Sequence, residues 1–166
     1  MSSVEIDHNE SLRNCMRMMV SIRKDMHLPD DFYYSCSEDV VLQYGKEFIP
    51  TPLQKPYVKD TPKYCFFNSY KLALEYPSLL YVEGFAMIRN LPIPIHHAWC
   101  IDKNDPYKVI DVTADLESYI GIPFKRNVFY MNWKTGSLLD DWKGNWKLMR
   151  TSPEQLKKKY LYSKIK

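Results

Sequence analysis

The middle of the chain reads LYVEGFAMI at residues 80–88, IHHAWCID at residues 95–102 and YKVIDVT at residues 107–113. Each stretch is rich in aromatic and β-branched residues, which favour β-strands. Turn-prone segments containing Pro92 and Pro106 separate the three stretches. Because short turns join antiparallel neighbours, the sequence predicts a meander of antiparallel strands here.

Helices are predicted on both sides of this meander. In residues 10–27, apolar side chains recur at steps of three and four, which is the spacing of one helical face. A short helix is predicted at residues 38–46 with Ser37 as its N-cap, and a last helix from Pro153 to about residue 162. Residues 127–133 are predicted to form a fourth strand.

A further helix is predicted to follow a proline-rich connector. Prolines recur through residues 50–62, which favours an extended surface segment there. Thr61 can cap the next helix and Pro62 can occupy its first position. Cys65 then falls in the first turn of a helix that runs to about Tyr76.

The composition is that of a soluble globular domain. Hydrophobic residues make up 45% and aromatic residues 14% of the 166 residues, enough to build a core. The formal charge of +3 is too small to indicate nucleic acid or a membrane as a partner. No apolar stretch approaches the roughly 20 residues of a membrane helix, and the first residues do not resemble a secretory signal. We therefore expect a cytoplasmic protein with reduced thiols.

Cys65 is the candidate nucleophile. A cysteine in the first turn of a helix lies among unpaired backbone N–H groups at the positive end of the helix dipole, and both stabilise a thiolate. The same N–H groups can stabilise the negative charge that develops on a substrate carbonyl. Cys15 and Cys100 are expected to be packing residues, because Cys15 lies on the apolar face of the first helix and Cys100 on a predicted strand.

The predicted strands carry a histidine and a carboxylate that could serve this nucleophile. Side chains alternate along a strand, so His96 and His97 point to opposite faces, and only one of them can meet Cys65. Alternation alone leaves that choice open. Asp111 interrupts an apolar strand, where a carboxylate is costly unless it is paired. Pairing with an imidazole would satisfy the charge and fix the tautomer of the histidine.

These residues, in this order, resemble the core of the transglutaminase-like superfamily. The matching blocks span residues 61–124 and are Cys65 opening a helix, Tyr81-Val82-Glu83-Gly84-Phe85-Ala86, His97-Ala98-Trp99 and Ile110-Asp111-Val112-Thr113. Small uncharacterised bacterial and phage proteins carry the same four blocks. The resemblance selects His97, and it implies a papain-like core in which Cys65, His97 and Asp111 are nucleophile, base and orienting carboxylate.

The same resemblance implies thiol-dependent acyl transfer on an amide or peptide carbonyl, with no cofactor and no metal. Activities in the superfamily include amide hydrolysis, deamidation, amide exchange and glycan-amide cleavage, and kinship of fold does not choose among them. The expected partner is a protein or peptide-like amide substrate. Two positions depart from the superfamily pattern, because Val112 replaces a proline and Tyr64 stands where many relatives have a small residue.

Four further residues are candidates for the oxyanion hole or the substrate cleft. Many relatives supply a second oxyanion donor from a Trp or Gln upstream of the nucleophile, but every tryptophan here lies downstream. Gln54 is therefore the upstream candidate. Tyr64 flanks the nucleophile, Trp99 can form a wall of the site, and Glu83 lies near the end of a predicted strand, where it can line the cleft.

The expected architecture is an α+β domain in which the Cys65 helix packs on an antiparallel sheet, with N-terminal helices beside it. One domain is expected over residues 1–166. Its expected parts are an N-terminal helical part at 1–49, the connector at 50–62, a catalytic core at 63–133 and a C-terminal extension at 134–166.

Other classes of function compete with catalysis. The main alternative is a non-catalytic binding or interaction module on the same fold, including a phage-encoded one. A nucleic-acid binder would use exposed aromatic residues and the basic run at residues 157–159, but such a run more often forms a solvated face. Zinc binding at His96, His97, Cys100 and Asp102 is disfavoured, because strand alternation places His97 on the face opposite the other three and no second Cys or His pair elsewhere has ligand spacing.

Overall fold

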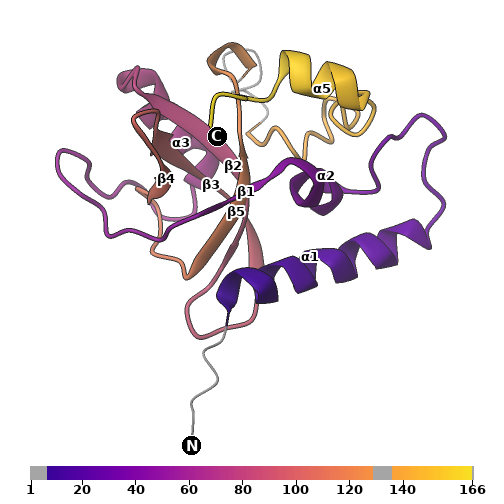
Figure 1. Ribbon diagram of the computed structural model, residues 1–166, viewed down its shortest axis with the longest axis horizontal. Helices are drawn as coiled ribbons and strands as arrows, with labels where there is room; N and C mark the ends of the chain where they lie inside the picture. The colour runs from indigo at the N-terminus through magenta and orange to yellow at the C-terminus, as the bar shows by residue number, and fades with distance from the viewer. Residues whose placement is uncertain (1–6, 129–135, 166) are drawn as a thin grey trace, which may run out of the picture.

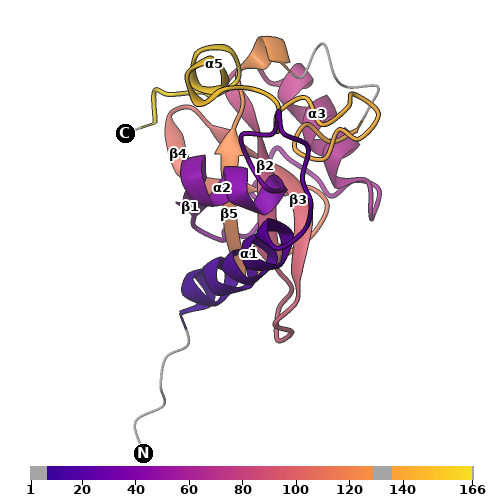
Figure 2. The ribbon, with the colours of Figure 1, turned by 90° about the vertical axis from the view of Figure 1, so that its right-hand side faces the viewer.

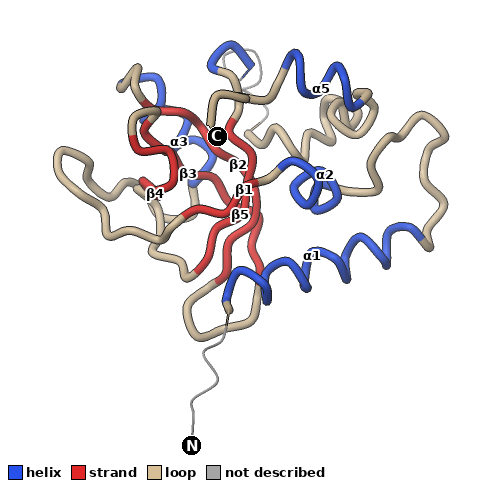
Figure 3. Tube along the Cα trace, viewed as in Figure 1, coloured by secondary structure: helices blue, strands red, loops and turns tan. Residues whose placement is uncertain are grey.

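The computed structural model describes residues 7–128 and 136–165. Over these residues the chain has an α+β fold, as predicted, built around a sheet in which all neighbouring strands run antiparallel (Figures 1 and 3). The strand order is β1-β5-β2-β3-β4. The strands are β1 (Lys46–Phe48), β2 (Leu79–Met87), β3 (Pro94–Asp102), β4 (Asp105–Ile110) and β5 (Ser118–Pro123).

The predicted meander is confirmed as β2, β3 and β4. The bounds of β2 and β3 differ from the predicted ones by a single residue at each shifted end. β4 ends at Ile110 rather than at residue 113, because the carboxylate of Asp111 accepts hydrogen bonds from the N–H groups of Thr113 and Ala114 and turns the chain. As a result, β3 pairs with β4 only from Cys100 onwards, and residues 94–99 of β3 have no partner in β4.

Two strands, β1 and β5, were not predicted from the sequence. β5 pairs with β2 so that Gly121 lies opposite Gly84. A Cβ atom on Gly121 would lie 2.6 Å from Cη2 of Trp99, so only glycine leaves room for the indole ring at this point.

The fourth strand that was predicted at residues 127–133 is wrong in the part that the structure describes. Residues 126–128 are helical, and residues 129–133 lie outside the described residues. The aromatic pattern of this segment resembles a strand, but a helical turn follows directly after β5 and the isolated bridge at Phe124.

The sheet curls until its two edge strands meet. Ile49, directly after β1, donates its N–H to the carbonyl of Tyr107 at 2.7 Å and accepts the N–H of Val109 at 3.1 Å, both in β4. All five strands contribute to the small core that the curl encloses, and we call this side the inner face. Its aromatic centre is Trp99, whose ring lies 5.7 Å from Phe48 and 5.0 Å from Tyr119, both edge to face.

Helices cover the other side of the sheet, which we call the outer face. Figure 1 shows α1 and α2 to the right of the sheet, and Figure 2 shows them in front of it. One large apolar cluster joins Leu12, Val41, Leu72 and Leu156, one from each of four helices, to side chains of the sheet. The helices are α1 (His8–Lys24), α2 (Ser37–Tyr44), α3 (Cys65–Glu75) and α5 (Pro153–Lys159).

The helix ends follow local chemistry that the sequence showed only in part. Asp7 caps α1, and Ser152 caps α5 with Pro153 in its first turn, the latter as predicted. The prediction that Ser37 caps α2 is wrong. Cys36 occupies the N-cap, and the hydroxyl of Ser37 instead donates to the carbonyl of Leu139 at 3.0 Å. No helix among the described residues has the length and apolar character needed to cross a membrane.

Candidate active site

His97 and Asp111 form a buried pair on the inner face. Nε2 of His97 lies 2.7 Å from Oδ2 of Asp111, and each side chain is only 3% exposed. The ring of His97 packs beside Trp99 and Tyr119, at 6.2 and 6.3 Å between ring centroids. The two residues come from β3 and from the turn after β4, so their pairing follows from the meander.

Four donors hold the carboxylate of Asp111. Oδ1 accepts the N–H groups of Thr113 and Ala114 at 2.8 and 3.0 Å, and Oδ2 accepts the hydroxyl of Tyr119 at 3.0 Å in addition to His97. Burial alone would raise the pKa of Asp111, but the hydrogen bond and charge of His97, with the two N–H groups, lower it below its usual value. Asp111 is therefore ionised at neutral pH.

The thiol of Cys65 is the third group of the site, on the other side of the His97 ring from Asp111. Burial alone would lower the pKa of His97, but the hydrogen bonds and charges of Asp111 and then of Cys65 raise it from 6.5 to about 9. Since Nε2 of His97 is bonded to Asp111, Nδ1 is the ring nitrogen left to interact with the sulfur. The side chains of Cys65, His97 and Asp111 thus lie together.

Cys65 is the first residue of α3, and this end of α3 contacts the part of β3 that is paired with β2 but not with β4. Asn68, one turn later, fixes this end of the helix, because its side-chain amide donates to the carbonyl of Thr61 at 2.7 Å and to the hydroxyl of Thr113 at 3.0 Å. The prediction that Thr61 caps the helix is wrong. Tyr64 is the N-cap and makes no side-chain capping bond, so the first N–H groups of α3 remain without a side-chain acceptor.

This arrangement has the parts that nucleophilic catalysis by a thiol requires. Cys65 is 7% exposed and lies at a helix N-terminus, the imidazole of His97 interacts with its thiol, and the carboxylate of Asp111 orients the imidazole. The first N–H groups of α3 belong to the same helical turn as Cys65, and N–H groups at this place can stabilise negative charge on a carbonyl oxygen that the thiol attacks.

His96 forms a second histidine–carboxylate pair, on the outer face, which sequence reasoning did not predict. Its Nε2 lies 2.9 Å from Oε1 of Glu83, whose side chain is fully buried. The carboxylate of Glu83 also accepts the hydroxyl of Tyr81 at 2.8 Å, the hydroxyl of Ser137, and the N–H groups of Leu138 and Leu139 at 2.8 and 2.9 Å. Glu83 therefore does not line an open cleft but binds the segment after residue 136 to the sheet.

The remaining predicted site residues lie in different surroundings. Tyr64 is 61% exposed beside Cys65 and is open to a substrate. Trp99 is fully buried and packs against His97 from within the inner core. The side-chain amide of Gln54 donates to the carbonyl of Pro52 at 2.8 Å, and Gln54 lines a separate pocket with Asp102 and others near the β3–β4 turn.

The described part of the chain contains no group of three or more His, Cys, Asp and Glu side chains placed to hold a metal ion. Comparison of the chain with family models, with curated proteins and with solved structures finds no match. The functional argument therefore depends on the geometry of the residues themselves.

Proposed function

We propose that this protein catalyses thiol-dependent acyl transfer on an amide or peptide carbonyl. The sulfur of Cys65 attacks the carbonyl carbon and forms a thioester, while the C–N bond breaks and His97 gives a proton to the leaving amine. Water or a second amine then attacks the thioester carbon and passes a proton to His97, which releases the acyl group and restores the thiol–imidazole pair. Asp111 holds His97 throughout.

One observation carries this proposal. The imidazole of His97 is bonded to Asp111 through Nε2 while its pKa responds to the thiol of Cys65, so one ring links sulfur and carboxylate. Here the carboxylate fixes the tautomer and favours an imidazolium next to the sulfur, which is the pairing that activates a cysteine.

The proposal extends to the core fold. A helix that begins at a cysteine and packs on an antiparallel sheet is compatible with the papain-like core of the transglutaminase-like superfamily. On this basis we propose carboxamides and peptide bonds of proteins or peptides as the substrate class, in the cytoplasm.

Alkylation by iodoacetamide tests the proposal. An ordinary thiol titrates near pH 8.5, so its labelling becomes slow at about pH 6. We expect Cys65 to remain rapidly labelled at that pH in the wild type and to lose this reactivity in His97→Ala. Peptide mapping by mass spectrometry separates Cys65 from Cys15, which is partly exposed and serves as the internal control.

Turnover is then measured on a carboxamide peptide, with ammonia release and amine incorporation as separate readouts. Cys65→Ser should abolish both. If Cys65 labels no faster than Cys15 at any pH, and no carboxamide is consumed, the acyl-transfer proposal is wrong.

A non-catalytic binding module on the same fold is the second candidate. The burial of the site favours it, since His97 is 3% and Cys65 is 7% exposed. A module of this kind would keep the His97–Asp111 pair for stability alone. It predicts that His97→Ala lowers the unfolding temperature while the slow labelling of Cys65 stays unchanged.

A further inference from the structure

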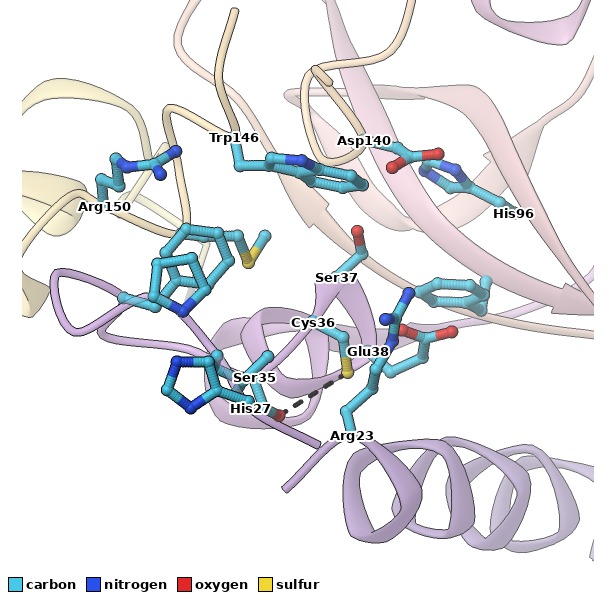
Figure 4. Close-up of a pocket in the computed structure, with 15 residues that line it drawn as sticks. Arg23, His27, Ser35, Cys36, Ser37, Glu38, His96, Asp140, Trp146 and Arg150 are labelled. Atoms are coloured by element: carbon cyan, nitrogen blue, oxygen red, sulfur yellow. Dashed lines mark hydrogen bonds between the residues drawn. The ribbon is translucent and has the colours of Figure 1, made fainter. Parts of the chain in front are cut away.

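A cavity of about 400 Å³ lies on the outer face of the sheet, at the lower end of the size range of small-molecule sites (Figure 4). It is enclosed by the end of α1, the start of α2 and the segment of residues 140–150. His96 and Phe85 form its floor on the sheet, with their rings stacked at 5.3 Å.

Three charged residues line one end of this cavity and form no ion pair with any residue that the structure describes. Arg23, Glu38 and Asp140 line the cavity, and none of them forms an ion pair within residues 7–128 and 136–165. Figure 4 shows Arg23 and Glu38 close together, with Asp140 beside His96 above them. Arg150, at the other end, differs from these three because it pairs with Asp31 at 2.6 Å, outside the cavity.

The opposite end of the cavity has aromatic and thioether side chains beside Arg150. The guanidinium of Arg150 lies 4.7 Å from the ring of Phe32, which lines the cavity together with Met149. In Figure 4 the indole of Trp146 extends from the side of Arg150 toward Asp140 and forms the upper wall. A ligand here would therefore meet an aromatic and thioether surface at one end and unpaired charges of both signs at the other.

From this pattern we propose that the cavity binds a free apolar α-amino acid. Its side chain would pack among Phe32, Trp146 and Met149. Its α-carboxylate would bind Arg23, and its α-ammonium would bind Asp140, with Nδ1 of His96 as a further acceptor. Because Nε2 of His96 is bonded to Glu83, the orientation of this ring is fixed before a ligand arrives.

This cavity is separate from the candidate active site. Neither Cys65 nor His97 lines it, and His97 points to the inner face while His96 points to the outer one. The ring of Phe66 packs on His96 at 4.9 Å, one residue after Cys65. The binding proposal does not depend on the acyl-transfer chemistry.

Isothermal titration calorimetry on the full chain tests the proposal with three probes: L-phenylalanine, N-acetyl-L-phenylalanine and L-phenylalaninamide. We expect saturable binding of L-phenylalanine. N-acetyl-L-phenylalanine lacks the ammonium group and L-phenylalaninamide lacks the carboxylate. Each should bind at least about tenfold more weakly, because each loses one charge-assisted hydrogen bond.

Variants assign the two charges. Arg23→Gln should bind L-phenylalanine about tenfold more weakly, as weakly as the wild type binds L-phenylalaninamide. Asp140→Asn should also bind L-phenylalanine about tenfold more weakly, as weakly as the wild type binds N-acetyl-L-phenylalanine. Arg17→Gln is the matched control on α1, since Arg17 pairs with Glu10. Cys65→Ala should bind as the wild type does.

Two outcomes overturn the proposal. In the first, the titration with L-phenylalanine shows no saturable binding heat up to about 10 mM, a concentration at which even a weak binding site would be occupied. In the second, the three probes bind equally, which shows that the cavity recognises only the aromatic ring. Arg17, Arg23 and Asp140 are at least partly exposed. The unfolding temperatures of all four variants, Cys65→Ala included, verify that they remain folded.

Discussion

Replacing Glu83 by Gln should destabilise the protein although the two side chains have nearly the same shape. Each carboxylate oxygen of Glu83 accepts a backbone N–H, Oε2 from Leu138 at 2.8 Å and Oε1 from Leu139 at 2.9 Å. A Gln side chain has only one oxygen. Whichever way its amide is turned, its NH₂ group faces one of these N–H donors, and a backbone donor cannot rotate away as a hydroxyl can.

The size of the effect follows from this network. Burial would raise the pKa of Glu83, but the hydrogen bonds from His96, Ser137 and Leu138 lower it below its usual value, so the charged form is favoured in spite of burial. Breaking a buried charged network costs about 3–5 kcal/mol. For a chain of this length each kcal/mol shifts the unfolding temperature by roughly 2–4 °C, so Glu83→Gln should lower it by roughly 6–20 °C.

Urea unfolding at pH 7, followed by tryptophan fluorescence, measures the free energy of unfolding. Glu47→Gln is the matched control, because Glu47 is 45% exposed and accepts a surface hydrogen bond from Arg13. It should cost less than about 1 kcal/mol. A loss below about 1 kcal/mol in Glu83→Gln itself would refute the argument that this carboxylate is held by five donors.

Three further predictions concern the inner face. Tyr119→Phe removes the hydroxyl bonded to Asp111 and leaves the N–H of Leu116 without its acceptor, so it should cost about 2–3 kcal/mol in urea unfolding, and a neutral result would contradict the hydrogen bond. Gly121→Ala should cost about 1–3 kcal/mol by the same measurement, because the new methyl group overlaps the indole of Trp99; an unchanged midpoint would refute the overlap. The pKa of His97 is raised from 6.5 to about 9, so its stabilisation is complete below pH 6.5 and is lost as the pH rises through 9. Unfolding free energies between pH 6 and 10 should show this loss in the wild type and not in His97→Gln.

The sequence predicted those elements whose pattern is strong over many residues. β2 and β3 are long apolar stretches bounded by proline turns, and α1 has a clear apolar stripe. β5 was missed because Gly121 and Pro123 resemble turn residues when the chain is read alone. In the structure Gly121 lies within β5, where a larger residue would overlap the indole of Trp99.

The candidate site was predictable where alternation and residue type agree. Cys65 at a helix start and Asp111 on an apolar strand gave two of its groups, but choosing between the adjacent histidines needed the resemblance to a known superfamily. The structure gives each histidine its own buried carboxylate, Asp111 for His97 and Glu83 for His96. The Glu83 network was not predictable, because its donors after residue 136 are more than 50 positions away.

The hydrogen bonds between Ile49 and β4 bear on the behaviour of this protein at high concentration. The edge of an open sheet presents free N–H and C=O groups that can recruit a strand from another molecule and begin aggregation. Here Ile49 and Val109 use their N–H groups across the seam between the two edges. Separating this seam would uncover both edges together, so local opening near Ile49 is the step at which self-association through strand exchange would begin.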